Sequence, residues 1–129
     1  MQELMTREIA EGLPRLYEQD GAEDPTVYAH YFSCVNGWDW WLLEFDGTDE
    51  AFGLVEGYDD ELGYFSIKEM AELNRQMGFA AVERDEHFEP KPLSAVKGRL
   101  LHGDGRGWRR GQIRQVPGRS RRADCRRRV

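Results

Sequence analysis

The fold is decided by the stretch from Thr26 to Ser66, which reads TVYAHYFSCVNGWDWWLLEFDGTDEAFGLVEGYDDELGYFS. Aromatic and aliphatic residues alternate with polar ones here, and turns rich in Gly and Asp interrupt them, a pattern typical of short antiparallel strands. Asn36-Gly37 is a strong hairpin signal, because both residues tolerate the positive φ angles of a two-residue type I′ turn. The predicted strands are Thr26–Cys34, Trp38–Asp46, Phe52–Tyr58 and a short fourth one, Tyr64–Phe65.

The alternation assigns the side chains of each strand to opposite faces of the sheet. In the first strand one face holds Tyr28, His30, Phe32 and Cys34. Cys34 is expected to be a small core residue. In the second strand Trp38 and Trp40 lie opposite Trp41 and Phe45. We therefore expect at least one tryptophan in the core and at least one outside it or under a helix; burial of all three is the alternative.

Helices are expected on both sides of this stretch. Thr6 can cap a first helix, which Pro14 ends or kinks because proline cannot continue a helix. Ser66 and Glu69 fit a capping box that opens a second helix. An extended segment, Phe79–Phe88, follows it. This order predicts an α+β fold, a small antiparallel β-meander sheet packed against two helices.

The charge of the 129-residue chain is divided between two regions. Residues 1–96 carry 6 basic and 22 acidic side chains, a net charge of −16, whereas residues 97–129 carry 12 basic and 2 acidic ones, a net of +10. We therefore predict an acidic α+β domain over residues 1–96 and a basic, irregular Arg/Gly-rich C-terminal tail over residues 97–129. Such a tail cannot bury enough apolar surface to offset the entropy of ordering it. Its excess of arginine over lysine is also what a GC-rich gene yields when read out of frame, so an accident of the gene is the alternative to a selected element.

Composition also excludes several classes of protein. No run approaches the roughly 20 apolar residues of a membrane span, and Met1–Asp20 lacks the apolar core of a signal peptide. With two cysteines and no export signal, we expect a cytoplasmic protein without membrane partners. The three histidines are scattered, no C-x-x-C pair occurs, and the glycines form no phosphate-binding loop after a strand, so no metal and no cofactor are expected.

Several short motifs occur together in a characteristic order. They are Leu13-Pro14-x-Leu16-Tyr17, Asp24-Pro25-x-Val27-Tyr28-Ala29, the strand Trp38–Asp46, Gly53-Leu54-Val55-Glu56-Gly57, Glu61-Leu62-Gly63-Tyr64-Phe65-Ser66, Glu83-Arg84-Asp85 and His87-Phe88. With them, about residues 4–96 resemble the bacterial family called domain of unknown function 2958. The resemblance implies a small soluble protein of a conjugative plasmid or other mobile element, often encoded near anti-restriction genes, and it implies no catalytic residue. The Arg-rich tail departs from the family pattern, which usually ends soon after the segment matching Pro92-Leu93-Ser94.

Acidic side chains gather at the predicted hairpin ends. A net charge of −16 repels nucleic acid and favours basic partners, and carboxylates spread over one face can compete for a DNA-binding surface as phosphates would. The favoured hypothesis is a non-enzymatic protein-interaction module of a mobile element, in its specific form an anti-defence inhibitor that presents a nucleic-acid-like surface to a basic protein. Solubility alone is the alternative reason for the charge. The candidate binding residues are Trp38, Trp40, Asp46, Asp49, Glu50, Glu56, Tyr58, Asp59, Asp60 and Glu61.

A hydrolase-like enzyme is the first rival hypothesis. Asp85 and His87 share a strand face, so the carboxylate could orient the imidazole, although the sequence places no nucleophile beside them. The alternative is a structural ion pair next to a surface histidine. Glu44, Asp46 and Glu56 could likewise share a face and act in acid–base chemistry or bind a divalent ion, with a solvated sheet face as the alternative.

A nucleic-acid binder that acts through the tail is the second rival hypothesis. It would use arginines of the basic runs, namely Arg109, Arg110, Arg121, Arg122, Arg126, Arg127 and Arg128. The tail could instead fold back on the acidic domain of its own chain. A homodimer that pairs two open sheet edges is also compatible with a short meander.

Overall fold

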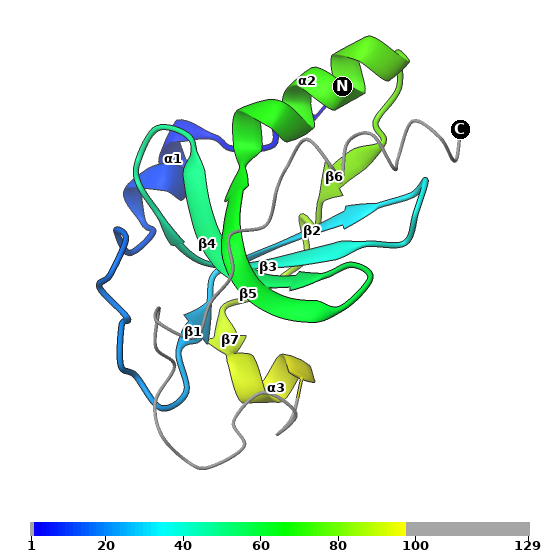
Figure 1. Ribbon diagram of the computed structural model, residues 1–129. Coiled ribbons are helices and arrows are strands. Elements are labelled where there is room, and N and C mark those ends of the chain that lie inside the picture. Colours follow the sequence, from blue (N-terminus) through cyan, green and yellow to red (C-terminus); the bar gives the residue numbers. More distant parts are fainter. Residues whose placement is uncertain (1, 98–129) are drawn as a thin grey trace.

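The computed structural model describes residues 2–97, which build a five-stranded sheet in the order β5-β4-β3-β2-β6 (Figure 1). Every neighbouring pair is antiparallel. The strands are β2 (Ala29–Ser33), β3 (Asp39–Phe45), β4 (Glu50–Glu56), β5 (Asp60–Ser66) and β6 (Val82–Arg84). Strands β2 to β5 follow one another as a meander, so the predicted α+β fold is confirmed; β5 is longer than the predicted fourth strand.

The predicted strand Thr26–Cys34 is divided between two sheets. β1 (Thr26–Val27) pairs with β7 (Lys91–Pro92) in a separate two-stranded sheet, and only the segment after Tyr28 joins the large one as β2. α3 (Leu93–Lys97) follows β7 directly. The backbone N–H of Leu93 donates to the carbonyl of Pro25 at 2.8 Å, which fastens this C-terminal helix to the loop before β1.

The turn between β2 and β3 is longer than the predicted two-residue turn. The backbone N–H of Ser33 donates to the Trp38 carbonyl at 2.9 Å, so four residues lie between the paired ends. Gly37 has a positive φ of 74°, whereas Asn36 does not have the positive φ that a type I′ turn needs. Cys34 lies in this loop and is exposed, so its predicted place in the core is wrong.

A β-bulge in β3 changes which side chains face the helices. The register with β4 shifts between Leu42 and Glu44, and Phe45 consequently joins the core that contains Trp40 rather than the face of Trp41. Opposite Leu42 stands Gly53, and a Cβ atom added there would lie 2.0 Å from the Trp41 carbonyl oxygen. Only glycine permits this close approach of the two strands.

One face of the large sheet is covered by α1 (Arg7–Glu11) and α2 (Ile67–Met77) (Figure 1). Thr6 caps α1 as predicted, since its Oγ1 accepts from the N–H of Ile9 at 3.1 Å, and Ser66 Oγ does the same for Glu69 at 3.0 Å. We call this the covered face. Its core is aromatic and aliphatic and contains Leu4, Leu13, Tyr31, Trp38, Trp40, Leu42, Phe45, Val55, Phe65, Met70 and Leu73.

A buried side-chain amide joins α2 to β6. Asn74 is 2% exposed, and it accepts from the N–H of Val82 and donates to the Val82 carbonyl, each at 2.8 Å. The amide thus pairs with this edge strand as a neighbouring backbone would.

Within the described residues 2–97, the other face of the sheet is covered over only part of its length. A second core lies there against α3, on the side of the sheet opposite α2 (Figure 1). It contains Val27, Leu43, Phe52, Leu54, Leu62 and Leu93, with Leu16, Trp41, Tyr64, Phe88 and Val96 half-buried at its border. Within residues 2–97 no helix has the length and apolar character needed to cross a membrane.

Candidate functional site

An acidic row crosses the uncovered part of this second face. The strand register places Asp39 of β3 opposite Glu56 of β4, and Glu56 opposite Asp60 of β5. Toward the other edge of the sheet, Asp39 lies opposite Phe32 of β2, and Phe32 lies opposite Glu83 of β6. Directly opposed residues point to the same face, and strands lie about 4.8 Å apart, so the row spans about 19 Å. Together with His30, Trp41 and Asp85, it forms the surface that we call the open face.

His30 lies in the middle of the open face between two carboxylates. Its Nε2 lies 2.7 Å from Asp39 Oδ1 and its Nδ1 lies 3.3 Å from Asp85 Oδ2. The His30 side chain is 13% exposed and both aspartates are 32% exposed. A protonated imidazole can donate to both carboxylates at once, whereas a neutral one has a single N–H.

Aromatic rings form the floor beside these carboxylates. The His30 ring stacks on Trp41, with centroids 3.8 Å apart and planes 6° from parallel, and Phe88 lies 5.9 Å from Trp41. Trp41 Nε1 donates to Glu56 Oε1 at 2.5 Å. Lys91 Nζ lies 5.0 Å from the Phe88 centroid, so a cation already contacts an aromatic ring at this border.

The hydrogen bonds to Asp85 lower the pKa of its carboxyl group. Partial burial acts in the opposite direction and raises the pKa. The hydrogen bonds from the His30 side chain and the His87 backbone N–H, together with the electrostatic attraction of the His30 and His87 rings, outweigh it. Asp85 therefore stays ionised and supplies fixed negative charge to the open face. No metal-binding group of three or more His, Cys, Asp or Glu side chains occurs in the part of the chain that the structure describes.

The structure corrects the predicted pairing of Asp85 with His87. Asp85 contacts the ring of His30 and only the backbone N–H of His87, at 3.0 Å, and His87 is exposed. Asp85 stays beside β2, because its N–H donates to the His30 carbonyl at 2.8 Å, whereas the turn that begins at Asp85 takes His87 away from the strand. The histidine held between the two carboxylates is His30, which no sequence motif singled out.

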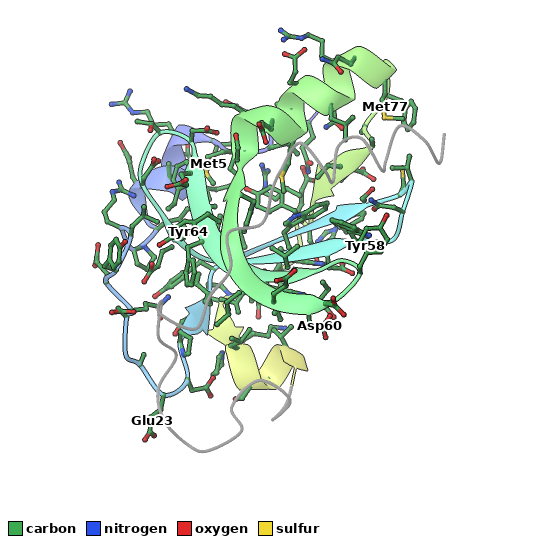
Figure 2. All side chains as sticks on the ribbon, viewed as in Figure 1. Met5, Glu23, Tyr58, Asp60, Tyr64 and Met77 are labelled. Atoms are coloured by element: carbon green, nitrogen blue, oxygen red, sulfur yellow. The ribbon has the colours of Figure 1, made fainter. Side chains whose placement is uncertain are left out.

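Two of the three predicted aromatic binding residues are core residues. Trp38 and Trp40 are 5% and 3% exposed, since α2 covers their face of the sheet. Their role as surface anchors is corrected accordingly. Tyr58 is 64% exposed and meets the Trp38 ring edge-on at 5.2 Å. Figure 2 shows Tyr58 and Asp60 at the turn between β4 and β5, where Asp59 is exposed and Glu61 half-buried.

The other predicted acidic residues lie at the opposite end of β4, about 20 Å away by the rise of a strand. Asp49 accepts from Ser66 Oγ and from the N–H of Lys68, each at 2.8 Å, and thereby supports the start of α2. Asp46 accepts from the N–H groups of Thr48 and Asp49 at the turn, and Glu50 opens β4. The ten predicted residues therefore do not form one surface.

Glu44 is a buried residue and does not share a solvated face with Asp46 and Glu56. It is 1% exposed, and its two carboxylate oxygens accept from the N–H of Tyr17 at 2.8 Å and of Gln19 at 2.7 Å. The bulge in β3 directs the Glu44 side chain toward the turn that contains Tyr17 and Gln19. Tyr17 has a positive φ of 75°. Its contacts are those of a structural carboxylate.

A groove of about 590 Å³ lies on the helical side, between the N-terminal segment and the start of α2. Its charges are mixed, with Arg7, Arg15 and Lys68 beside Glu3 and Glu11. The Arg15 guanidinium donates to the carbonyl oxygens of the surrounding chain. The groove therefore lacks the single sign of charge that distinguishes the open face.

The tail arginines Arg109, Arg110, Arg121, Arg122, Arg126, Arg127 and Arg128 lie outside the described residues, as does the tail predicted to be irregular.

Comparison with known proteins identifies the chain by its family. The family model "Protein of unknown function (DUF2958)" matches residues 3–97, and the chain belongs to this family. This confirms the family that the sequence motifs indicated. No curated protein and no solved structure matches the chain.

Proposed function

We propose that this member of the DUF2958 family is a non-enzymatic protein-interaction module, which binds a basic partner protein through the open face and the adjoining turn between β4 and β5. The observation that carries the proposal is the register of Asp39, Glu56 and Asp60 on three neighbouring strands. These carboxylates are partly or fully exposed, and Tyr58 stands beside them as an exposed aromatic side chain.

Like charges directly opposite one another weaken a sheet. Cationic side chains that bind between the strands would therefore reduce the repulsion between these opposed carboxylates. Cations of a partner would gain charge-assisted hydrogen bonds at the same time. Tyr58 adds the kind of aromatic contact that contributes strongly at protein interfaces.

The chemistry of His30 also supports recognition over catalysis. Both ring nitrogens are directed at Asp39 and Asp85, and one face of the ring is stacked on Trp41. An imidazole held in this way orients two carboxylates and fixes their spacing. We propose that His30 is a positioning residue of the open face.

The more specific form of the proposal concerns the biological setting. In a mobile genetic element, a basic partner would be a nucleic-acid-directed protein of the host defence, and the open face would occupy its phosphate-binding surface. The support is the acidic row itself, in which three neighbouring strands each present a carboxylate, as successive nucleotides each present a phosphate. Inhibition of such a protein is the expected consequence.

Affinity capture with the full chain as bait tests the proposal. The open-face variant carries Asp39→Asn, Glu56→Gln and Asp60→Asn, and the matched control carries Glu8→Gln, Glu11→Gln and Glu72→Gln on the two covering helices. Both sets remove three negative charges. We expect a basic protein to be recovered with wild type and the control, and lost with the open-face variant.

Equal recovery with all three baits, or recovery of no basic protein with wild type, would overturn the proposal. Because both substitution sets change the net charge equally, the comparison separates a defined surface from a general attraction to an acidic protein.

A further inference from the structure

We propose that the open face is also the docking surface for the chain's own arginine-rich segment, residues 98–129, which competes there with an outside partner. This inference rests on the proposed function, because it assigns the same surface to an intramolecular ligand. It names arginine as the side chain that the open face recognises.

Charge complementarity is the first argument. Residues 98–129 contain 11 arginines, no lysine and 2 aspartates, a net charge of +9. The domain of residues 1–96 in the same molecule carries a net charge of −16, the opposite sign. A covalent tether holds the two at a high effective concentration, so weak contacts suffice for binding.

The position of α3 is the second argument. Leu93 and Val96 pack in the second core, whose border includes Trp41 and Phe88 of the open face. The segment therefore starts from the side of the sheet where the acidic row lies, opposite α2 (Figure 1). At about 3.3 Å per extended residue, 32 residues reach about 100 Å, several times the width of the row.

The mixture of carboxylates and aromatic rings is the third argument, and it favours arginine over lysine. A guanidinium can donate to a carboxylate in a bidentate manner while its plane stacks on a ring. The open face offers Asp39, Glu56 and Asp85 next to half-buried Phe32 and Trp41. The contact of Lys91 with Phe88 shows that the same border accepts a cation over a ring.

Paramagnetic relaxation in the full chain tests the inference. A spin label is attached to Cys125, which lies between the runs Arg121-Arg122 and Arg126–Arg128, after Cys34→Ser removes the exposed thiol of the domain. We expect the label to broaden the amide signals of Phe32, Asp39 and Glu56 more than those of Ala71 and Arg75 on the outer side of α2. The effect should fade at about 0.5 M salt, where the Debye length is only about 4 Å.

Two variants of the segment separate recognition from charge. Replacing the 11 tail arginines by lysine keeps the charge and should reduce the broadening, and replacing them by glutamine should abolish it. Equal broadening on both sides of the sheet, equal broadening in the lysine variant, or no broadening at low salt would each overturn the inference. A further control mixes spin-labelled chains without isotope with isotope-enriched chains without label. Equal broadening in this mixture and within one chain would also overturn the inference, because the tail of a second copy would then be the occupant.

A synthetic oligo-arginine peptide distinguishes failure of this inference from failure of the proposed function. If the peptide binds the open face of the glutamine variant but the label shows no contact in the wild-type tail, the surface binds basic chains and only the intramolecular ligand is refuted. If the peptide does not bind either, the proposed function fails with it.

Discussion

The two faces of the central sheet are built from alternate residues of the same strands, yet they differ in burial and in charge. On the covered face, Tyr31 and Trp40 pack with α2 and are almost inaccessible. One residue further along the same strands, Phe32 and Trp41 lie half-buried among carboxylates on the open face. The larger core thus lies on one face, and the opposed carboxylates lie on the other.

Truncating one aromatic side chain on each face should give the largest contrast. Trp40→Ala removes a buried indole and should lower the free energy of unfolding by about 4 kcal/mol. Phe32→Ala on the open face should cost about 1 kcal/mol, because less apolar area leaves water there on folding. Urea unfolding followed by circular dichroism measures both; equal losses would contradict the division between the faces.

The bulge that separates the faces depends on Gly53. Gly53→Ala should lower the free energy of unfolding by about 3 kcal/mol, because the new methyl group meets the Trp41 carbonyl and forces β3 and β4 apart. Gly12→Ala is the matched control, since a Cβ there would lie 3.7 Å from the Ile9 carbonyl oxygen and φ is −90°. Comparable melting temperatures for the two variants would show that the strands do not approach so closely.

The buried carboxylate of Glu44 should have an intermediate effect. Glu44→Gln replaces one acceptor oxygen with an NH₂ group that faces a backbone N–H, so the free energy of unfolding should fall by about 2 kcal/mol. The loss should be accompanied by faster proteolysis within residues 15–22. Glu23→Gln, an exposed residue in the loop that follows this turn, serves as the control and should change stability by less than about 0.5 kcal/mol.

One residue on each face should also make the free energy of unfolding depend on pH, at opposite ends of the pH range. Burial raises the pKa of Tyr31 far above its ordinary value of 10.0, although the nearby Arg84 acts in the opposite direction. The unfolded chain therefore loses this proton first, and stability that is complete below about pH 10 falls as the pH rises above it. Tyr31→Phe should remove part of this alkaline loss in pH-dependent unfolding.

On the open face the direction is reversed. The pKa of Asp85 is lowered from its ordinary 3.8, so its contribution is present above about pH 4 and is lost as the pH falls through the lower folded value. Asp85→Asn should flatten the acid limb of the stability curve and leave the alkaline limb unchanged. A variant that altered both limbs would refute the assignment of the two residues to separate faces.

Much of the fold followed from side-chain alternation, because burial on one face specifies strand parity strongly. The meander and the caps at Thr6 and Ser66 were predictable. The alternation also assigned His30 and Asp39 to definite faces of their strands. The turn was not, since Asn36-Gly37 indicated two residues and the chain uses four. That error places His30 opposite Leu43 instead of Trp41, so the contacts of His30 with Asp39 and Trp41 were missed.

The bulge and the division of the first strand had no clear sequence signal. A bulge depends on the fit of two strands, and Gly53 is its only local trace. The division of the first strand at Tyr28 accompanies the pairing of β1 with β7, which lies more than sixty residues away. Long-range pairing of this kind is invisible to local patterns, and it also decides that Asp85 meets β2.

The affinity of the open face for a cationic chain is the central property to measure. Calorimetric titration with a synthetic oligo-arginine peptide measures this affinity for the wild-type surface, the open-face variant and the helix-side control, each in the full chain whose 11 tail arginines are replaced by glutamine so that the tail does not compete. We predict that the open-face variant binds at least about tenfold more weakly, as expected for the loss of three partly exposed charge pairs, and that the control binds as wild type does. Equal weakening in both variants would contradict a defined binding face and leave only the net charge of the domain.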